Sequence, residues 1–433
     1  MGLDFLLANE EQFNDLVAGT HAIANAIRGR RTNGVVYAFH IDGSESDPEE
    51  MVTYLEDAVG MTPAKMNFTT GMFDWGSWKN AFFIPRPCML KYDGTVDYYL
   101  DADNYAYKAD GSASDVADLS YGGNAMMEWG GNGVIWYKVV PDANDTTSAT
   151  IYIADHKADD GFVAWSYVNN QGRMVPHFYT PIYTGHIDTN GKMRSISGQA
   201  PTTSTTATQE VTAATANNPG DNVLWYTEVL ADVMLINFLL ILMGKSTDTD
   251  AVFGHGHTTG ASSAAGLTAS GALDDKGMFY GYNDETHAVK VFGMENWWGN
   301  HWRRYAGHIL DGGTQKIKLT YGQQDGSSAS GYNQTGSGYL TVPNATPTGT
   351  SGGYISKARF TANGLFPFEA SGTSSTYYCD GLWFNNSGQK YALRGGLASG
   401  DGRLCGALYV YLSYAPGNAI WDFGAALSCK PVA

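Results

Sequence analysis

The sequence predicts an α+β fold with short strands, two or three helices and long Gly-rich loops. Patterns typical of short strands occur early and late in the chain, and the strongest helical pattern lies between them. That order favours α+β over the regular strand–helix alternation of a parallel α/β sheet. Aromatic residues make up 13% of the chain, charged residues only 16%, and glycines number 53. This composition is typical of loops packed by Tyr and Trp, and it excludes a disordered chain.

Residues 10–28 are expected to form a helix that precedes the main domain. Its apolar residues fall at spacings of three and four, the pattern of a coiled-coil seam with one polar position: Phe13, Leu16, Thr20, Ile23 and Ile27. Two interpretations remain open, namely oligomerisation or attachment to a larger assembly, and packing of the helix on its own domain. We therefore divide the chain into an N-terminal segment, residues 1–33, and one elaborated domain, residues 34–433.

The first elements of that domain are predicted from local signals. Val35–Ile41 is rich in β-branched and aromatic residues and is expected to be a strand. Asp47 and Pro48 offer an N-cap and a first helical residue, so a helix is expected from there to Ala58. Between residues 82 and 153, repeated Asp-Gly and Gly-rich turn signals predict a series of short strands.

The helical region occupies the middle of the chain. Residues 203–216 favour a first helix, and residues 222–243 predict the strongest one, with Gly244 as its left-handed C-cap. The apolar part of this second helix is too short to span a bilayer. It also contains Asp232 and Asn237, so a buried helix is expected.

Charge and cysteine content narrow the function classes. The formal net charge is −17, and the chain has no basic stripe with which to bind nucleic acid. The N-terminus lacks the pattern of a secretory signal, and no segment is expected to insert into a membrane. The four cysteines form no Cys-x-x-Cys pair, which argues against structural zinc. Reduced, buried thiols are expected, and a bridge from Cys405 to Cys379 or to Cys429 remains open.

The richest aromatic motif is Gly293–Tyr305, which contains three Trp within six residues. Such a segment can form a sugar-stacking shelf or organise the core. We favour the core, because neighbouring Trp side chains more often pack than bind. Arg394 precedes two glycines, and we expect it to be buried against a carboxylate such as Glu295.

No established catalytic or metal-binding motif occurs in the sequence. His255 and His257 lie in a Gly-rich loop without a third ligand nearby, whereas zinc needs three or four ordered ligands. Asp159-Asp160 and Asp274-Asp275 are expected to be solvated turns and not catalytic pairs. We therefore expect no catalytic residues, no metal and no cofactor.

Residues 395–428 have the composition of a binding surface. From residue 408 to residue 413, Leu or Val alternates with Tyr or Ser, and a strand sends alternate side chains to opposite faces. One face would then be aliphatic and buried, and the other would display Tyr409, Tyr411 and Ser413. Antibody-like surfaces combine Tyr, which gives contact area at low entropic cost, with small adaptable residues. The alternative is an ordinary Tyr-rich surface strand.

These motifs resemble a known fold. Glu295–Trp302 resembles the Gly-Asn-x-Trp-x-Trp segment of formylglycine-generating-enzyme-type C-type-lectin folds, and Leu393–Gly396, Gly406–Ser413 and Asp422–Leu427 resemble their C-terminal strands. Among proteins of this fold, the chain looks most like the variable proteins of diversity-generating retroelements and like phage tail receptor-binding proteins. The clear resemblance covers about residues 290–429. It implies a C type lectin-like (formylglycine-generating-enzyme-type) fold.

The resemblance also implies a function. In such variable proteins, reverse transcription of a template diversifies exposed positions on fixed strands. The chain would be a phage tail-fibre adhesin in the virion, with a host-cell surface receptor or another protein or glycan ligand as partner. Further partners would be copies of itself, for example in a trimer, or other virion proteins. The implied ligand-binding residues are Leu397, Ser399, Gly400, Asp401, Leu404, Tyr409, Tyr411, Ser413, Tyr414, Ile420, Trp421 and Asp422.

Two other function classes remain open. A formylglycine-generating oxidoreductase needs a thiol pair for copper, and an iron-dependent relative needs a histidine site. Cys405 and Cys429 are the only near pair of thiols in the sequence, and no clustered histidine motif accompanies them. The third class is a structural virion protein without a ligand. A reverse-transcriptase gene and a near-copy of the 3′ end beside this gene would decide for the adhesin.

Overall fold

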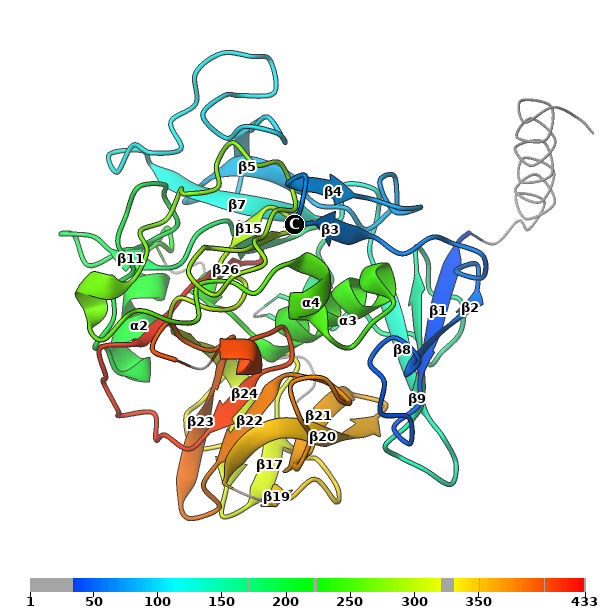
Figure 1. Ribbon diagram of the computed structural model, residues 1–433. Coiled ribbons are helices and arrows are strands. Elements are labelled where there is room, and N and C mark those ends of the chain that lie inside the picture. Colours follow the sequence, from blue (N-terminus) through cyan, green and yellow to red (C-terminus); the bar gives the residue numbers. More distant parts are fainter. Residues whose placement is uncertain are drawn as a thin grey trace, which may run out of the picture.

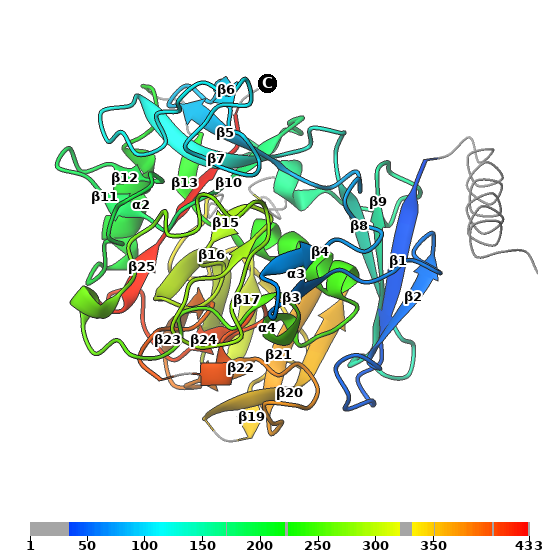
Figure 2. The same ribbon diagram turned by 45° about the horizontal axis from the view of Figure 1, so that its top comes forward.

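The computed structural model describes residues 34–169, 171–220, 224–320, 331–349, 351–400 and 402–431. Within these residues the chain is a mixed α+β protein in which strands far outnumber helices. The central helices lie between two large sheets, and a smaller sheet stands at one side (Figures 1 and 2). The helix expected at residues 10–28 lies outside the described residues.

The smaller sheet is antiparallel and four-stranded, in the order β2 (Val52–Glu56), β1 (Val36–Ile41), β9 (Ala149–Ala154) and β8 (Trp136–Pro141). The strand expected at residues 35–41 is thus confirmed. The prediction of a helix from Asp47 to Ala58 is wrong. Asp47 caps only one turn, closed by a bond from the Met51 N–H to its carbonyl, and the chain then pairs with β1. Pairing of β-branched and aromatic residues with a neighbouring strand outweighs the local capping signal.

The second sheet has six strands and includes the last strand of the described chain. Its order is β13 (Trp225–Thr227), β26 (Leu427–Cys429), β10 (Phe178–Pro181), β7 (Gly123–Trp129), β5 (Arg86–Lys91) and β6 (Val96–Tyr99). Because β26 lies between β13 and β10, residues near the C-terminus are fixed inside a sheet formed by much earlier segments.

The third sheet is strongly curled and carries the predicted binding region (Figure 1). Its main path is β18 (Leu340–Thr341), β17 (Thr314–Ile317), β16 (Trp302–Asp311), β23 (Gln389–Arg394), β24 (Val410–Leu412), β22 (Gly381–Phe384), β20 (Gly352–Thr361), β21 (Gly364–Ala370) and β19 (Thr348–Gly349). In addition, β25 (Phe423–Ala425) pairs in parallel with the start of β16.

Short elements complete the fold. The two-stranded ribbons are β3 (Lys65–Asn67) with β4 (Met72–Asp74), β11 (His186–Ile187) with β12 (Met193–Arg194), and β14 (Lys290–Val291) with β15 (Met294–Glu295). The single-turn 3-10 helices are η1 (Trp165–Tyr167), η2 (Ala264–Gly266) and η4 (Gly402–Leu404).

The α-helices of the described residues are α2 (Ala207–Thr215), α3 (Leu230–Gly244) and α4 (Thr249–Phe253). The helix expected at residues 203–216 is confirmed in a shorter form, which begins after a capping box formed by Thr206 and Gln209. The strongest predicted helix begins later than expected, because β13 occupies its first residues. Its left-handed C-cap is Lys245, with φ of 50°, and not Gly244. Among the helices of the described residues, none has the length and apolarity to span a bilayer.

Helix α3 is the centre of the core, and its residues from Leu230 to Met243 are all buried, as expected. Its two polar residues connect it to the C-terminal region. Asp232 forms an ion pair of 2.9 Å with Lys430, and Asn237 accepts a hydrogen bond of 3.0 Å from the indole of Trp297. The Asn237 amide also donates to the carbonyl of Ala407, just before β24. Burial of these polar groups is therefore compensated by bonds that join the helix to the end of the second sheet, the Trp-rich segment and the residues before β24.

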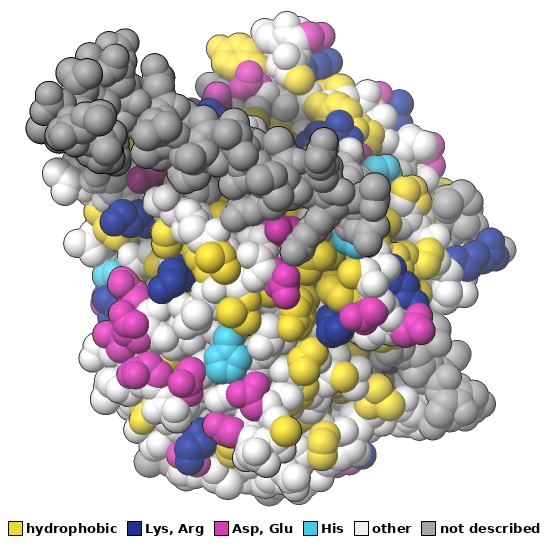
Figure 3. Space-filling model, turned by 90° about the vertical axis from the view of Figure 1, so that its right-hand side faces the viewer, with side chains coloured by type: hydrophobic (Ala, Val, Ile, Leu, Met, Phe, Trp, Pro, Cys, Tyr) yellow, Lys and Arg dark blue, Asp and Glu magenta, His cyan; other side chains and the backbone are white. Residues whose placement is uncertain are grey.

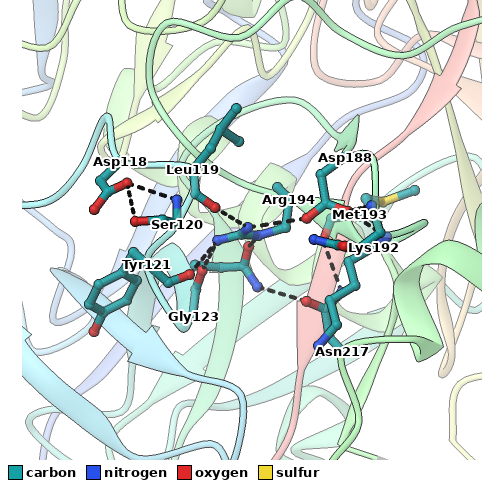
Figure 4. Close-up of polar contacts among 12 residues, drawn as sticks. Asp118, Leu119, Ser120, Tyr121, Gly123, Asp188, Lys192, Met193, Arg194 and Asn217 are labelled. Carbon is teal, nitrogen blue, oxygen red and sulfur yellow. Dashed lines mark hydrogen bonds and ion pairs between the residues drawn. The ribbon is translucent and has the colours of Figure 1, made fainter.

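A second cluster of buried polar groups surrounds Arg194 of β12 and holds the neighbouring loops together. The Arg194 guanidinium donates hydrogen bonds of 2.7–2.8 Å to the carbonyls of Leu119, Tyr121 and Gly123, and it also pairs with Asp188 (Figure 4). The arginine side chain is 2% exposed. Most of the N–H groups of this guanidinium donate to backbone carbonyls, so we interpret the cluster around Arg194 as structural.

Candidate functional site

The predicted binding region is built around β24, an interior strand of the curled sheet. It pairs in parallel with β22 and antiparallel with β23, so that Tyr411 lies between Trp383 and Leu393. An interior strand has hydrogen bonds on both sides and does not present an open edge. The backbone of this region is therefore a fixed support for the side chains that it displays.

Half-buried aromatic rings form a stack on this support. We call Trp383, Tyr411 and Tyr414 the aromatic row. Trp383 and Tyr411 stack at 6.0 Å between ring centroids and 17° between planes, and Tyr411 and Tyr414 at 5.3 Å and 15°. Phe423 closes the row, with its ring 4.8 Å from that of Tyr414 in an edge-on contact. Because the faces of Tyr411 are covered by neighbours, the row offers mainly ring edges to a ligand.

Two of the candidate residues are buried, which corrects the expectation that they are displayed. Tyr409 is 0% exposed, and its ring packs against buried Trp302 with 4.7 Å between centroids. The strand begins only at Val410, so the alternation expected from residue 408 does not reach Tyr409. Leu397 is 7% exposed, because the chain turns into the core after Gly395 and Gly396, whose φ values are 84° and 87°.

Val410 and Leu412 are buried while Tyr411 and Ser413 are half-buried, so the expected alternation holds from residue 410 to residue 413. The buried ring of Trp302 supports Tyr411 from beneath, at 4.8 Å between centroids. The displayed part of the strand is thus shorter than predicted, and Tyr414 extends it beyond the last strand residue.

The loop of residues 397–404 contacts a different part of the molecule. Ser399 and Gly400 are exposed, Leu404 is half-buried, and Asp401 lies outside the described residues. The Gly400 N–H donates to the carbonyl of Thr258 at 3.1 Å. The candidate loop therefore lies against the loop that precedes η2.

Arg403 fastens this loop to α4. Its guanidinium forms ion pairs of 3.1 Å with Asp248 and 2.9 Å with Asp250. Asp248 is also the N-cap of α4 and accepts from the Ala251 N–H. The pKa of the Asp250 carboxyl is raised well above its usual value, mainly by burial and also by the neighbouring Asp248 carboxylate. No local pattern in the sequence predicts this contact, because the partners are far apart in the chain.

Ile420, Trp421 and Asp422 are half-buried in the segment that leads to β25. This segment is held by Arg304, which donates to the carbonyl of Asn418 and forms an ion pair with Glu210 of α2. Burial raises the pKa of the Glu210 carboxyl to about 7, against the opposing effect of Arg304. The third group of candidate residues thus lies beside the N-terminal end of α2.

The Trp-rich segment is part of the core, as predicted. Trp297, Trp298 and Trp302 are each at most 2% exposed. Arg394 is also buried against a carboxylate, as expected, but the partner is Glu228 and not Glu295. Glu295 instead accepts the backbone N–H groups of Gly271 and Leu273.

The remaining histidine and aspartate candidates mostly have structural roles or are solvated. The Nδ1 of His257 contacts Thr268 and Asn300. Asp159 and Asp160 are exposed, as predicted. Asp274 is not a solvated residue. It accepts from the hydroxyls of Tyr183 and Ser197, and burial raises the pKa of its carboxyl.

All four cysteines are reduced and buried, as expected. Cys405 packs in the main core cluster, whereas Cys429 packs in a second cluster with Cys88. The thiol pair on which the oxidoreductase alternative depended is therefore not assembled. Among the described residues, no group of His, Cys, Asp or Glu side chains is arranged to hold a metal ion. The expectation that the protein works without a metal stays a prediction.

An open cleft of about 810 Å³ lies elsewhere, between residues 47–49, the β3–β4 ribbon and the connection from α3 to α4. Asp47, Glu49 and Asp74 line it together with Lys65 and Lys245. Acidic side chains also gather on part of the face that includes β1 and β2 (Figure 3). Carboxylates of this kind are typical of a solvated surface and do not by themselves define a site.

In comparisons with known proteins, no family model matches this chain, and no match to a curated protein is found.

Proposed function

We propose that this chain is a ligand-binding protein of the retroelement-diversified type, in which a C-type lectin-like scaffold displays a mutable surface, as a phage tail-fibre adhesin does. The aromatic row is the observation that carries the proposal. Three half-buried rings stand on the interior strand β24 and beside it, and buried Trp302 supports the central ring, that of Tyr411. Rigid Tyr and Trp side chains are the residues that dominate binding hot spots.

The arrangement of the resembling segments also supports the proposal. The segments that resemble the lectin-type fold lead into β16 or overlap β23, β24 and β25. In the structure, β16 pairs with both β23 and β25, and β23 pairs with β24. Segments separated by more than a hundred residues therefore meet in one sheet. The displayed surface would consist of Ser399, Gly400, Leu404, Tyr411, Ser413, Tyr414, Ile420, Trp421 and Asp422, with Trp383 as an added member.

A genetic experiment tests the origin of this surface. Sequencing the gene and its neighbours should find a reverse-transcriptase gene and a near-copy of the codons for about residues 395–428. Clones from a growing population should differ at adenine-containing codons for exposed positions and keep those for Tyr409 and Trp302. Absence of both the reverse transcriptase and the repeat would remove the retroelement part of the proposal.

A binding experiment tests the surface itself. Labelled full-length protein is incubated with a panel of bacterial cells, and bound protein is measured. Tyr411→Ser and Tyr414→Ser should each reduce binding at least tenfold, since hot-spot side chains contribute about 2 kcal/mol or more. Tyr107→Ser is the matched control, because Tyr107 is 48% exposed and lies outside the surface. Equal binding by all three variants would contradict the proposal.

A further inference from the structure

A buried charge cluster beneath β24 contains more cations than anions. Arg303 of β16 and Arg394 of β23 are register partners, and both side chains are at most 2% exposed. Both pair with the same carboxylate, that of Glu228, at 3.4 Å and 2.6 Å respectively. Glu228 is their only ion-pair partner in the part of the chain that the structure describes. Two buried guanidinium groups therefore share one buried carboxylate.

Near neutral pH both guanidinium groups stay protonated, so the cluster keeps its excess positive charge. Burial, together with the neighbouring Arg394, lowers the pKa of Arg303 to about 9, which still leaves its guanidinium protonated at pH 7. Both guanidinium groups lie near the ring of Trp297, with Cζ 3.7 Å from the centroid for Arg394 and 5.3 Å for Arg303. A ring face moderates a buried cation but does not cancel its charge.

Two N–H groups of this cluster have no hydrogen-bond acceptor among the described residues. Arg394 uses Nη1 for the carbonyl of Trp297 and Nη2 for Glu228, whereas its Nε finds no hydrogen-bond partner among the described residues. The same holds for Nη1 of Arg303 within the described chain. A guanidinium can only donate, so these positions require an acceptor. An unmet buried donor costs about 1–3 kcal/mol, more when it is charged.

Arg394 lines a small cavity. Its volume is about 40 Å³, and its lining combines apolar residues of α3 and β21 with residues 407–410. Arg394, Tyr305 and Asn237 supply polar groups to the wall. Since one water needs roughly 10–15 Å³, the space accommodates about three waters or one small ion. Organic ligands need pockets of roughly 300 Å³ or more.

We propose that this cavity binds one small monovalent anion, chloride, beside Arg394. The anion would accept from the unpaired Nε of Arg394 and would balance the second buried cation, which leaves the cluster neutral. His308 also lines the cavity, but its two ring nitrogens already contact Tyr305 and Gln315. Because residues 408–410 form part of the cavity wall and lead into β24, bound chloride would stabilise the support of the aromatic row.

Thermal unfolding in two salts tests the proposal. Unfolding midpoints are measured in sodium chloride and in sodium gluconate at equal ionic strength, because gluconate is too large for the cavity. The midpoint should rise with chloride concentration by about 2 °C or more and then saturate, as mass action requires. Arg303→Met removes the excess cation and should abolish the chloride dependence. Lys79→Met, at an exposed lysine, is the matched control and should retain it.

A midpoint that is equal in the two salts would overturn the proposal, as would an unchanged chloride dependence in Arg303→Met. A direct measurement covers the case in which this variant fails to fold. Crystals of the unaltered protein grown in sodium bromide should give an anomalous peak in the cavity, within hydrogen-bond distance of Arg394. Solvent density without a bromide peak would overturn the proposal. Neither outcome bears on receptor binding, because no ligand other than the halide is used.

Discussion

Nη2 of Arg394 donates a hydrogen bond of 2.6 Å to Oε1 of Glu228, and both side chains are at most 3% exposed. The two residues lie 166 positions apart in the sequence. Arg394 also donates to the carbonyl of Trp297, while the Glu228 N–H donates to the carbonyl of Ala426. This ion pair therefore joins β23, the segment before α3, the Trp-rich segment and the residues after β25.

Glu228→Gln should be strongly destabilising. The substitution keeps the shape of the side chain but leaves two buried guanidinium groups without a carboxylate. Loss of one partner of a buried pair costs roughly 3–5 kcal/mol. Urea unfolding measures the free energy, and Glu50→Gln at an exposed position should change it by less than about 0.5 kcal/mol. A loss below about 1 kcal/mol for Glu228→Gln would show that the pair is not essential to the core.

Tyr409→Ala and Tyr414→Ala should differ in their cost to stability. Tyr409 is fully buried, and a Cβ on Gly381 would lie 2.3 Å from its ring, so its removal leaves a cavity. Truncation of a buried aromatic residue costs about 3–5 kcal/mol. Tyr414 loses mainly its contacts with Tyr411 and Phe423, about 1 kcal/mol. Denaturant unfolding of both variants checks this order, and equal costs would mean that the aromatic row is itself part of the core.

The core was the part of this fold that the sequence predicted best. Helix α3 is apolar on all sides, so its burial followed from composition alone. The dense Trp segment likewise indicated a core organiser, and its rings are buried. In both cases the signal is local, because a large apolar side chain is stabilised by burial against almost any neighbour.

The errors arose where partners distant in the sequence decide the outcome. The alternation predicts that Tyr409 is displayed, but the strand begins only at Val410. The carboxylate partner of Arg394 is chosen by the pairing of distant strands, so Glu295 and Glu228 could not be distinguished. The roles of Arg403 and Trp383 could not be predicted from the sequence for the same reason, since their contacts form only in the folded chain.

Acidification should destabilise the protein through His308. Burial lowers the pKa of this ring from 6.5 to about 4, so the unfolded state takes up a proton that the folded state does not. The stability that this ring provides is complete above pH 6.5 and is lost as the pH falls toward about 4. A difference of this size corresponds to about 3 kcal/mol.

The measurement is urea unfolding at several pH values between 7.5 and 4.5. Other groups also titrate in this range, so the useful quantity is the difference between a variant and the unaltered protein. His308→Gln should lose less stability on acidification, whereas Tyr305→Phe keeps the titrating ring and should lose as much as the unaltered protein. Parallel pH curves for His308→Gln and the unaltered protein would contradict this assignment.

Arg403→Met should loosen the candidate binding loop while leaving the core intact. The guanidinium pairs with Asp248 and Asp250, and Asp250 is only 1% exposed on its side chain. Its removal leaves buried carboxylates without a cation. The expected loss is about 1–2 kcal/mol, less than for a fully buried pair, because Arg403 is 31% exposed. Hydrogen exchange of residues 397–404 should become faster, while that of α3 should not change.

The matched control is Arg173→Met, which removes an exposed arginine and should leave exchange unchanged. The double variant Arg403→Met/Asp250→Asn should recover part of the lost stability, because it also removes the buried carboxylate that has lost its cation. If the loop of Arg403→Met exchanges as slowly as that of the unaltered protein, the hydrogen bonds from the loop backbone to Thr258 hold it without the ion pairs. Arg403 would then be as free to vary as its exposed neighbours Ser399 and Gly400.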